Sequence, residues 1–422
     1  MNALSHDEIY LNRQPILDAR QDLIGYELTL LDGQRETAGG SPANDATLVC
    51  STYSELGVRG ALGRHKAFLR IDPKFLHDDA ICALPTDGVV IQLILEEKQA
   101  PAGAVLERCR ALRRRRYSLG LINYRGLDET SSPLLALVDF VKIGAHGKDA
   151  RQLTALTEPL ARRPLKLLAH GVDAPEDFAR CRDSGFQFFQ GNFFAHSKIV
   201  SRRRLTASQA TLIDLINLVA RDDAVPARIE EHVKRDAALA DKLLAIINSI
   251  AYGLPRQIGS VHQAVHVLER RQLKRWLYLL LMTPAGKAPD AGRTPLLQAA
   301  ALRARMMEML LIHLQPGDAE LAGQAFIAGL MSMMPAALGL PMDEILELVA
   351  LDREITVALQ SRRGLLGAML TLIECYDAGD ADGCDLILAG FVHIGLDRTQ
   401  LNACLVDALR WINASENAKP CD

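Results

Sequence analysis

The distribution of apolar residues changes near residue 200 of this 422-residue chain. Before that point, short runs rich in Val, Ile, Leu, Phe or Tyr alternate with segments of helical composition. The middle runs are continuous, which is typical of strands buried on both faces in a parallel sheet covered by helices. The runs cover residues 24–31, 67–71, 88–95, 117–124, 140–143, 166–169 and 186–194. For residues 1–200 we predict an α/β domain, a compact (β/α)8-type barrel in preference to an open doubly wound sheet.

After residue 205 the apolar residues recur at helical spacing instead. One helix face, with positions i, i+4, i+7, i+8 and i+11, consists of Leu239, Leu243, Ile246, Ile247 and Ile250. Similar patterns predict helices at residues 208–220, 261–268, 273–282, 294–314, 321–334, 345–350 and 365–378. Runs typical of strands are nearly absent. The sequence therefore predicts an all-α domain over residues 205–408, joined to the first domain by a polar, basic connection at 197–204.

The overall charge is nearly balanced. The chain has 48 Lys and Arg against 51 Asp and Glu, a formal net charge of -3, so no general field attracts nucleic acid or anionic lipid. Its apolar stretches are well short of the roughly 20 residues that span a bilayer. The first residues lack the basic flank and apolar run of a secretory signal. We expect a cytoplasmic protein whose partners are other proteins, with no membrane or nucleic-acid partner.

Residues with metal-ligand spacing are scarce. No two of the eight cysteines have CxxC spacing, which argues against a zinc or disulfide framework. His262 and His266 are four residues apart and can share a helix face, but no carboxylate motif lies near them in the sequence. Because a zinc site needs three or more ligands, we interpret this pair as one imidazole at the edge of the core and one on the surface.

Four ordered motifs in the first half carry a family resemblance. They are RQPILDARQDLIGYEL at 13–28, DFVKIG at 139–144, LLAHGVD at 167–173 and GFQFFQGNFF at 185–194. On these motifs the first half resembles EAL domains. The resemblance implies an EAL-type (β/α)8 barrel, the fold of enzymes that, when active, hydrolyse cyclic di-GMP with divalent metals.

Three motifs in the second half resemble HDOD domains, helical relatives of HD-type metal phosphohydrolases. They are LADKLLAIINSIAYG at 239–253, IGSVHQAVHVL at 258–268 and AFIAGLMSMMPAALGLPMDEIL at 325–346. A fused EAL and HDOD arrangement is a bacterial signalling family. The resemblance implies a degenerate EAL-type domain over 1–200 and an HDOD domain over 205–408.

Most metal ligands that the EAL resemblance implies are replaced in this sequence. The signature Glu is Glu27, but the residues after it are Leu28, Thr29 and then Leu31. The other ligand positions hold Arg70, Gln92, Leu95 or Glu96, Ile122 and Asn123, Gly144, and His170. Since Mg²⁺ requires oxygen ligands in near-octahedral geometry, we expect no metal pair, no cofactor and no catalytic residue. Glu27, Lys142 and Gln190 remain as candidates for a vestigial pocket, where they could also simply pair with one another.

The second half departs from its enzymatic relatives in the same way. An HD enzyme holds its metal with an adjacent His and Asp, and the matching positions are Ser332 and Met333. Neither side chain can replace that pair.

We therefore predict a catalytically inactive bacterial signalling adaptor that binds regulatory proteins and is linked to cyclic di-GMP pathways. Self-association through the helical domain is a further expectation. The alternative is a non-catalytic cyclic dinucleotide sensor, with Glu27, Lys142 and Gln190 as its pocket and the HDOD domain as its output. The motifs name neither the partner nor the process.

Overall fold

The structure is a computed structural model. It describes residues 10–31, 46–55, 57–72, 75–94, 103–126, 132–195, 205–221, 223–249, 258–283 and 294–417. The connection predicted at 197–204 lies outside these residues. The chain divides into two compact units. The barrel unit comprises Met1–His196, Gly379–Asp385 and Asp397–Ala403, and the helical unit comprises Ser197–Ala378, Leu386–Leu396 and Cys404–Asp422.

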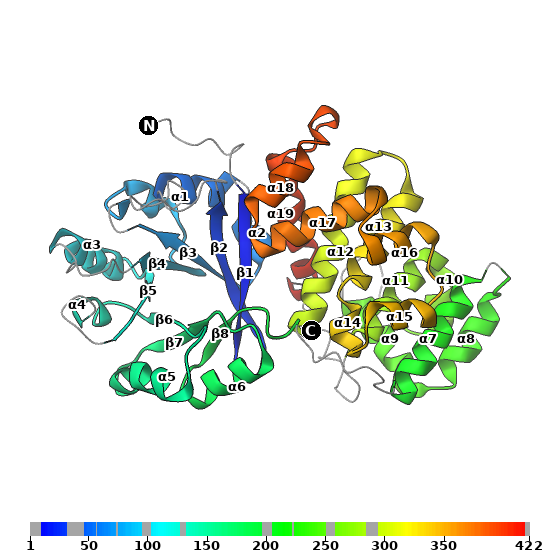
Figure 1. Cartoon of the computed structure of the whole chain (residues 1–422), viewed down its shortest axis with the longest axis horizontal. Helices are drawn as coiled ribbons and strands as arrows, with labels where there is room; N and C mark the ends of the chain where they lie inside the picture. Colours follow the sequence, from blue (N-terminus) through cyan, green and yellow to red (C-terminus); the bar gives the residue numbers. More distant parts are fainter. Residues whose placement is uncertain are drawn as a thin grey trace. The chain divides into compact units, whose positions relative to one another are not determined.

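Eight strands of the barrel unit close into a barrel in sequence order (Figure 1). They are β1 (Tyr10–Asp18), β2 (Leu23–Leu31), β3 (Lys66–Ile71), β4 (Val89–Ile94), β5 (Ser118–Ile122), β6 (Phe140–Gly144), β7 (Lys166–His170) and β8 (Phe188–Gln190). Strands β2 to β8 are parallel, whereas β1 runs antiparallel to both of its neighbours, β2 and β8. This confirms the predicted barrel, with one strand in the opposite direction.

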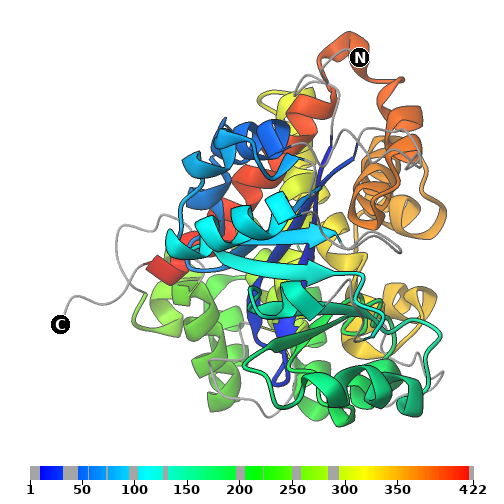
Figure 2. The same ribbon diagram turned by 90° about the vertical axis from the view of Figure 1, so that its left-hand side faces the viewer.

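Helices cover the outside of the strands (Figures 1 and 2). They are α1 (Ala46–Glu55), α2 (Val58–Leu62), α3 (Gly103–Arg114), α4 (Ser132–Leu135), α5 (Ala150–Thr157) and α6 (Pro175–Asp183), with 3-10 turns η4 (Asp79–Ala83) and η5 (Glu158–Leu160). The sequence sets their ends clearly in α5, where Asp149 and Gln152 form a reciprocal capping box.

An apolar layer fills the barrel interior. Inward-facing residues of five strands form one buried cluster, namely Ile16, Phe68, Val90, Phe140 and Leu168, and Phe188 packs against it. The Phe68 and Phe140 rings meet edge to face with centroids 5.2 Å apart. The barrel is thus a packed core closed below its mouth, as the fold requires.

Two short segments from the end of the chain complete the barrel unit around β1. They belong to α18 (Ala381–Leu388) and α19 (Arg398–Asn417). The backbone N–H of Leu11 donates to Oδ1 of Asn402 at 2.8 Å, and both residues are buried. The hydroxyl of Tyr10 donates to Asp385, which also accepts a hydrogen bond from Nε of Arg398 at 2.8 Å. The first strand therefore obtains partners from residues almost 400 positions away.

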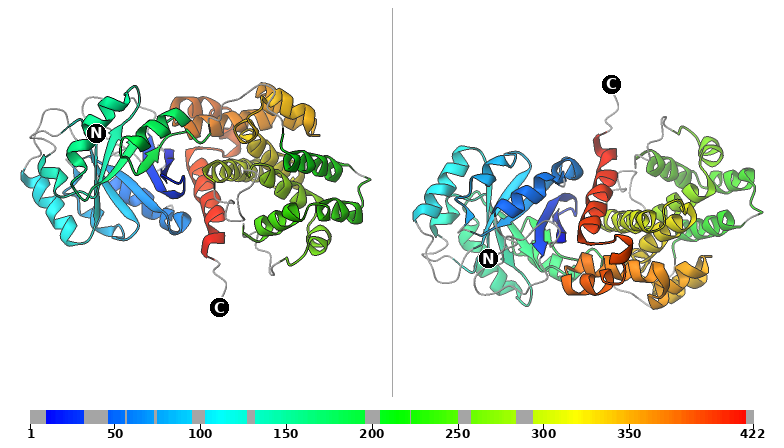
Figure 3. Two further views of the ribbon diagram at one scale, coloured as in Figure 1. Left: turned by 90° about the horizontal axis from the view of Figure 1, so that it is seen from below. Right: turned by 90° about the horizontal axis from the view of Figure 1, so that it is seen from above.

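The described residues of the helical unit contain helices and no strand, as predicted (Figure 3). The helices before residue 300 are α7 (Ala207–Ala220), α8 (Pro226–Lys234), α9 (Ala237–Ser249), α10 (Val261–Val267), α11 (Arg270–Leu281) and α12 (Pro295–Leu314). They are followed by α13 (Ala319–Met331), α14 (Met334–Leu338), α15 (Met342–Leu348), α16 (Arg353–Ser361), α17 (Gly364–Ala378) and the 3-10 turn η7 (Val392–Ile394). No helix among the described residues is long and apolar enough to cross a membrane.

Helices α12 and α13 approach each other closely at Gly329. A Cβ atom at this position would lie 2.8 Å from the Cα of Ala304, so the contact requires glycine. The close approach brings the end of α13 next to the middle of α12. The adjacent His and Asp of an HD enzyme would lie directly after this end, at Ser332 and Met333.

Candidate functional site

The barrel interior becomes polar two residues beyond its apolar layer. Side chains alternate between the faces of a strand, so the residue two positions after an inward one also faces inward. On β3, β4, β6, β7 and β8 this places a polar side chain toward the carboxyl end of the strand, where barrels of this class carry their sites. On antiparallel β1 the matching residue precedes Ile16. We call the resulting set the polar layer: Gln14, Glu27, Arg70, Gln92, Lys142, His170 and Gln190.

Glu27 lies at the centre of the polar layer. Its Oε2 atom accepts a hydrogen bond from Nζ of Lys142 at 2.5 Å and another from Nε2 of Gln190. The same Gln190 nitrogen donates to Oε1 of Gln14 at 2.7 Å, and a guanidinium nitrogen of Arg70 lies 3.7 Å from Oε1 of Glu27. The structure thus brings together Glu27, Lys142 and Gln190, the three residues that the sequence left as pocket candidates.

Burial and pairing have opposite effects on the charge of Glu27. Burial alone raises its pKa, but the positive charges of Lys142 and Arg70 and the hydrogen bonds from Lys142 and Gln190 outweigh it, so the pKa is lowered. Burial lowers the pKa of Lys142, and Glu27 partly restores it. The side chains of Glu27 and Lys142 are only 3% and 4% exposed. They form an enclosed ion pair in which each charge depends on the other.

His170 and Gly144 stand side by side where two carboxylates were implied. A Cβ atom on Gly144 would lie 3.3 Å from Nε2 of His170. Burial, followed by the positive charge of Lys142, lowers the pKa of His170 to about 4. At neutral pH the imidazole is therefore uncharged and adds no negative charge to the mouth.

The remaining replaced positions also bring no carboxylate. Gln92 is buried on β4, Ile122 is buried at the end of β5, and Asn123 follows it as an exposed residue in the left-handed region, with φ 62°. Leu95 and Glu96 lie outside the described residues.

The donor set at the mouth does not fit a pair of divalent cations. The only carboxylates within the eight strands as described are Glu27 and Asp18, and Asp18 lies at the opposite end of the barrel, paired with Phe188. Asp72, which is buried, follows β3 directly. No three His, Cys, Asp or Glu residues described at the mouth gather as a metal would require. Within the polar layer itself, two cations lie beside the one carboxylate, which disfavours metal binding.

A cation lies beside Ser332, one of the two residues at the positions where a metal pair was expected in the helical unit. The Oγ of Ser332 accepts a hydrogen bond from Arg303 of α12 at 3.0 Å and donates to the carbonyl of Gly329 at 2.7 Å. Arg303 in turn pairs with Asp377 of α17 at 2.8 Å. Met333 is 9% exposed and offers no hard ligand. This arrangement is an internal ion pair and resembles no metal centre.

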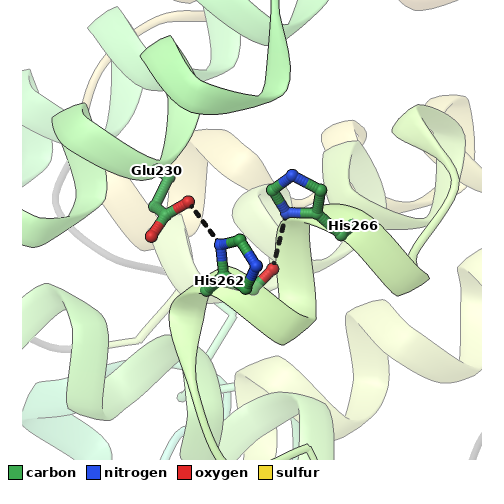
Figure 4. A group of neighbouring side chains, drawn as sticks. All are labelled: Glu230, His262 and His266. Atoms are coloured by element: carbon green, nitrogen blue, oxygen red, sulfur yellow. Dashed lines mark hydrogen bonds and ion pairs between the residues drawn. The ribbon is translucent and has the colours of Figure 1, made fainter.

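The interpretation of His262 and His266 was wrong for one of the two imidazoles. Both imidazoles are exposed, so neither lies at the edge of the core. In addition, a carboxylate does lie beside them: Nδ1 of His262 is 2.9 Å from Oε2 of Glu230 (Figure 4). Glu230 lies on α8, 32 positions earlier in the chain, where a search for local spacing cannot find it.

Gln14 was missed because β1 was not predicted as a strand. Its sequence, YLNRQPILD, has four consecutive polar or proline residues and no apolar run. The alternation of side chains between the two faces of a strand could have found it, because Gln14 precedes the inward-facing Ile16 by two positions.

Residues 205–340 match the family model of the HDOD domain, so the chain contains an HDOD domain after an eight-stranded barrel. Over nearly its whole length it is similar to YuxH of Bacillus subtilis (strain 168), with 22% identity over 419 residues, 97% of this chain and 100% of that protein. It is also 27% identical over 411 residues to "Cyclic di-GMP phosphodiesterase CdgJ" of Vibrio cholerae, covering 95% of this chain and 92% of CdgJ. A solved EAL domain protein from Listeria monocytogenes EGD-e matches 46% of this chain and 89% of its own, with 16% identity and a TM-score of 0.35.

Proposed function

We propose that the protein is a non-catalytic bacterial signalling regulator, linked to cyclic di-GMP pathways, that acts by binding regulatory proteins. One observation carries the non-catalytic part. Glu27, the one carboxylate of the polar layer, is already held by Lys142 and lies near Arg70. A carboxylate that is neutralised by two protein cations has no charge left to bind a metal.

The link to cyclic di-GMP rests on the resemblance and on the relatives. CdgJ is named as a cyclic di-GMP phosphodiesterase, and the similarity covers both halves of the chain. The motifs of the first half resemble those of EAL domains. These points support a role in cyclic di-GMP signalling, while the polar layer supports a role that does not involve hydrolysis.

Protein recognition is supported by the exposed apolar side chains. Those of the described residues that are large and more than about a third exposed all belong to the helical unit: Val225, Val267, Ile312, Leu348, Leu386, Val392 and Ile394. Three of them fall within residues 386–394, and Leu386 is 80% exposed. Exposed apolar clusters on soluble proteins commonly mark interaction sites.

Hydrolysis is tested by incubating the purified full chain with cyclic di-GMP and either Mg²⁺ or Mn²⁺ and separating the products by chromatography. CdgJ, as a named phosphodiesterase, is the positive control under the same conditions. We expect no linear dinucleotide above the rate without protein. Metal-dependent turnover by the native chain would refute the proposal, and its loss in Glu27→Gln would show that the activity belongs to the polar layer.

Protein binding is tested by cross-linking in a bacterial host, with identification of the captured proteins by mass spectrometry. We expect a defined regulatory partner that is captured by the native chain and lost with Leu386→Asp and Val392→Asp together. The matched control is Leu348→Asp, which changes an exposed apolar residue outside residues 386–394. Equal capture by all three proteins contradicts recognition through this segment.

A second candidate function, a cyclic dinucleotide sensor, is supported by the same polar layer. Its two cations, Lys142 and Arg70, suit a phosphate, whereas the buried oxygens Oε1 of Glu27, Gln92 and Gln190, which have no hydrogen-bond donor among the described residues, suit the N–H groups of a guanine base. Calorimetric titration of cyclic di-GMP without metal separates the two functions. Saturable binding that Arg70→Gln weakens favours the sensor, and an absence of heat favours the adaptor.

A further inference from the structure

A compact group of potential metal ligands lies on the helical unit, within the region that matches the HDOD family model. It consists of Glu230 from α8 and His262 and His266 from α10 (Figure 4). One ligand atom from each residue lies within 4.8 Å of the others. Among the described residues this is the one group of three or more His, Cys, Asp and Glu side chains with such spacing.

The two histidines are held on one face of α10. Positions i and i+4 of a helix are neighbours, and the ring centroids are 4.2 Å apart. The opposite face of α10 is buried at Val261, Ala264 and Val265, which fixes the rotation of the helix. The backbone therefore presents both imidazoles in the same direction, toward Glu230 on α8.

The hydrogen bonds leave ring nitrogens available as ligands. Nδ1 of His266 donates to the carbonyl oxygen of His262 at 2.9 Å, so the proton is on Nδ1 and Nε2 carries a lone pair. Such a bond from the second nitrogen to a carbonyl is the usual support of a metal-binding histidine. Glu230 already contacts one of the two rings, since its Oε1 accepts a hydrogen bond from Lys234 and its Oε2 faces Nδ1 of His262. The group thus offers two imidazoles and one carboxylate.

We propose that Glu230, His262 and His266 form a binding site for a divalent transition-metal ion, with Zn²⁺ as the ion that this donor set fits best. Two histidines and one carboxylate are a known zinc ligand set with one position open for water. Hard cations such as Mg²⁺ prefer oxygen ligands throughout. Tetrahedral zinc separates its ligand atoms by about 3.4 Å, so closure requires movements of about 1 Å by side chains that are exposed or partly exposed.

A bound ion would tie α8 to α10, which are separated in the chain by α9. Lys234 competes with the ion, because its ammonium group pairs with Oε1 of Glu230. The lysine side chain is 58% exposed and can move into solvent. Removal of this competitor should strengthen binding, whereas removal of a ligand should weaken it.

The site is tested by calorimetric titration of Zn²⁺ into the full chain without an affinity tag. We expect one zinc per chain and an affinity that falls about tenfold or more in each of Glu230→Gln, His262→Gln and His266→Gln. Lys234→Gln should raise the affinity by about two- to fivefold. Thermal unfolding should show a rise in the midpoint with Zn²⁺ that the three ligand variants lose.

Glu231→Gln and His232→Gln are the matched controls, because they change the same residue types on α8 outside the group. Both should bind Zn²⁺ like the native chain. Co²⁺ in place of Zn²⁺ should give a spectrum without the intense charge-transfer band of cysteine ligation. The proposal would be overturned by thiolate bands in the Co²⁺ spectrum or by Zn²⁺ binding weaker than millimolar. It would also be overturned if a triple variant, with Glu230, His262 and His266 all changed to Gln, bound Zn²⁺ as well as the native chain.

Discussion

The barrel mouth and the centre of the helical unit have the same charge arrangement in very different surroundings. In each, a protein cation pairs with a carboxylate where the family resemblance implies a metal: Lys142 with Glu27, and Arg303 with Asp377. The first pair is almost completely enclosed, whereas Arg303 and Asp377 are 15% and 30% exposed. The comparison teaches that burial decides how costly it is to break such a pair.

The largest effect is expected from Lys142→Met. It leaves the buried carboxylate of Glu27 with only the more distant Arg70 as a charge partner and should reduce the free energy of unfolding by about 3 kcal/mol. Urea unfolding followed by circular dichroism measures the change. Both tryptophans, Trp276 and Trp411, belong to the helical unit, so their fluorescence reports that unit separately.

The matched control for this change is the double variant Glu27→Gln with Lys142→Met. It removes both charges, so it should be more stable than Lys142→Met alone despite carrying one more substitution. If the double variant is the less stable of the two, the cost does not arise from an unpaired buried charge.

A smaller effect is expected from pH, through His170. Its pKa is about 4 in the folded protein and about 6.5 when unfolded, so between these values the unfolded chain binds more protons. Stability contributed by the neutral imidazole is therefore present above about pH 6.5 and is lost as the pH falls toward 4, by at most about 2 kcal/mol between pH 7.5 and pH 5. Urea unfolding at pH 7.5 and pH 5 should show a smaller loss for His170→Gln than for the native chain. Equal losses of stability in the variant and the native chain would show that His170 is not the source of this pH dependence.

The third change, Arg303→Met, tests the more open pair. It leaves Asp377 and Ser332 without the guanidinium, but water can reach the carboxylate, so we expect a loss of about 1–2 kcal/mol. Tryptophan fluorescence in urea measures it. If Arg303→Met lowers the free energy of unfolding more than Lys142→Met does, burial does not determine which of the two ion pairs is costlier to break.

The smallest effect is expected at an exposed pair. Glu231 and Arg235 lie one helix turn apart at 2.9 Å, and both side chains are about two-thirds exposed. Glu231→Gln should change the free energy of unfolding by less than about 0.5 kcal/mol. A change above about 1 kcal/mol in the same urea titration would show that the cost of breaking an ion pair does not follow its burial.

The fold was largely predictable because its strands and helices carry periodic apolar patterns. The continuous run at 88–95 became β4, and the pattern at 365–378 became α17. Strand β1 was not predicted, since a strand that pairs antiparallel with β2 and contains Asn12, Arg13, Gln14 and Pro15 has no apolar run. Long-range pairing, not local composition, holds it in place.

The candidate sites were less predictable. Position in the motifs was enough to mark Glu27, Lys142 and Gln190, but the pairing of residues 115 positions apart required the closed barrel. The partner of His262 lies on another helix, and the cation beside Ser332 comes from the middle of α12. Spacing along a chain reports neighbours on one helix or strand and carries no signal for contacts between elements.

The segments of α18 and α19 beside β1 have a consequence for synthesis of the chain on the ribosome. The first strand emerges first, yet Leu11 finds its partner Asn402 only when nearly the whole chain has been made. At about 5–20 residues per second, translation from residue 200 to residue 403 takes about 10–40 s. During that time the barrel lacks the hydrogen bonds that join Tyr10 to Asp385 and Leu11 to Asn402, and an incomplete fold of this kind is open to aggregation and available to chaperones.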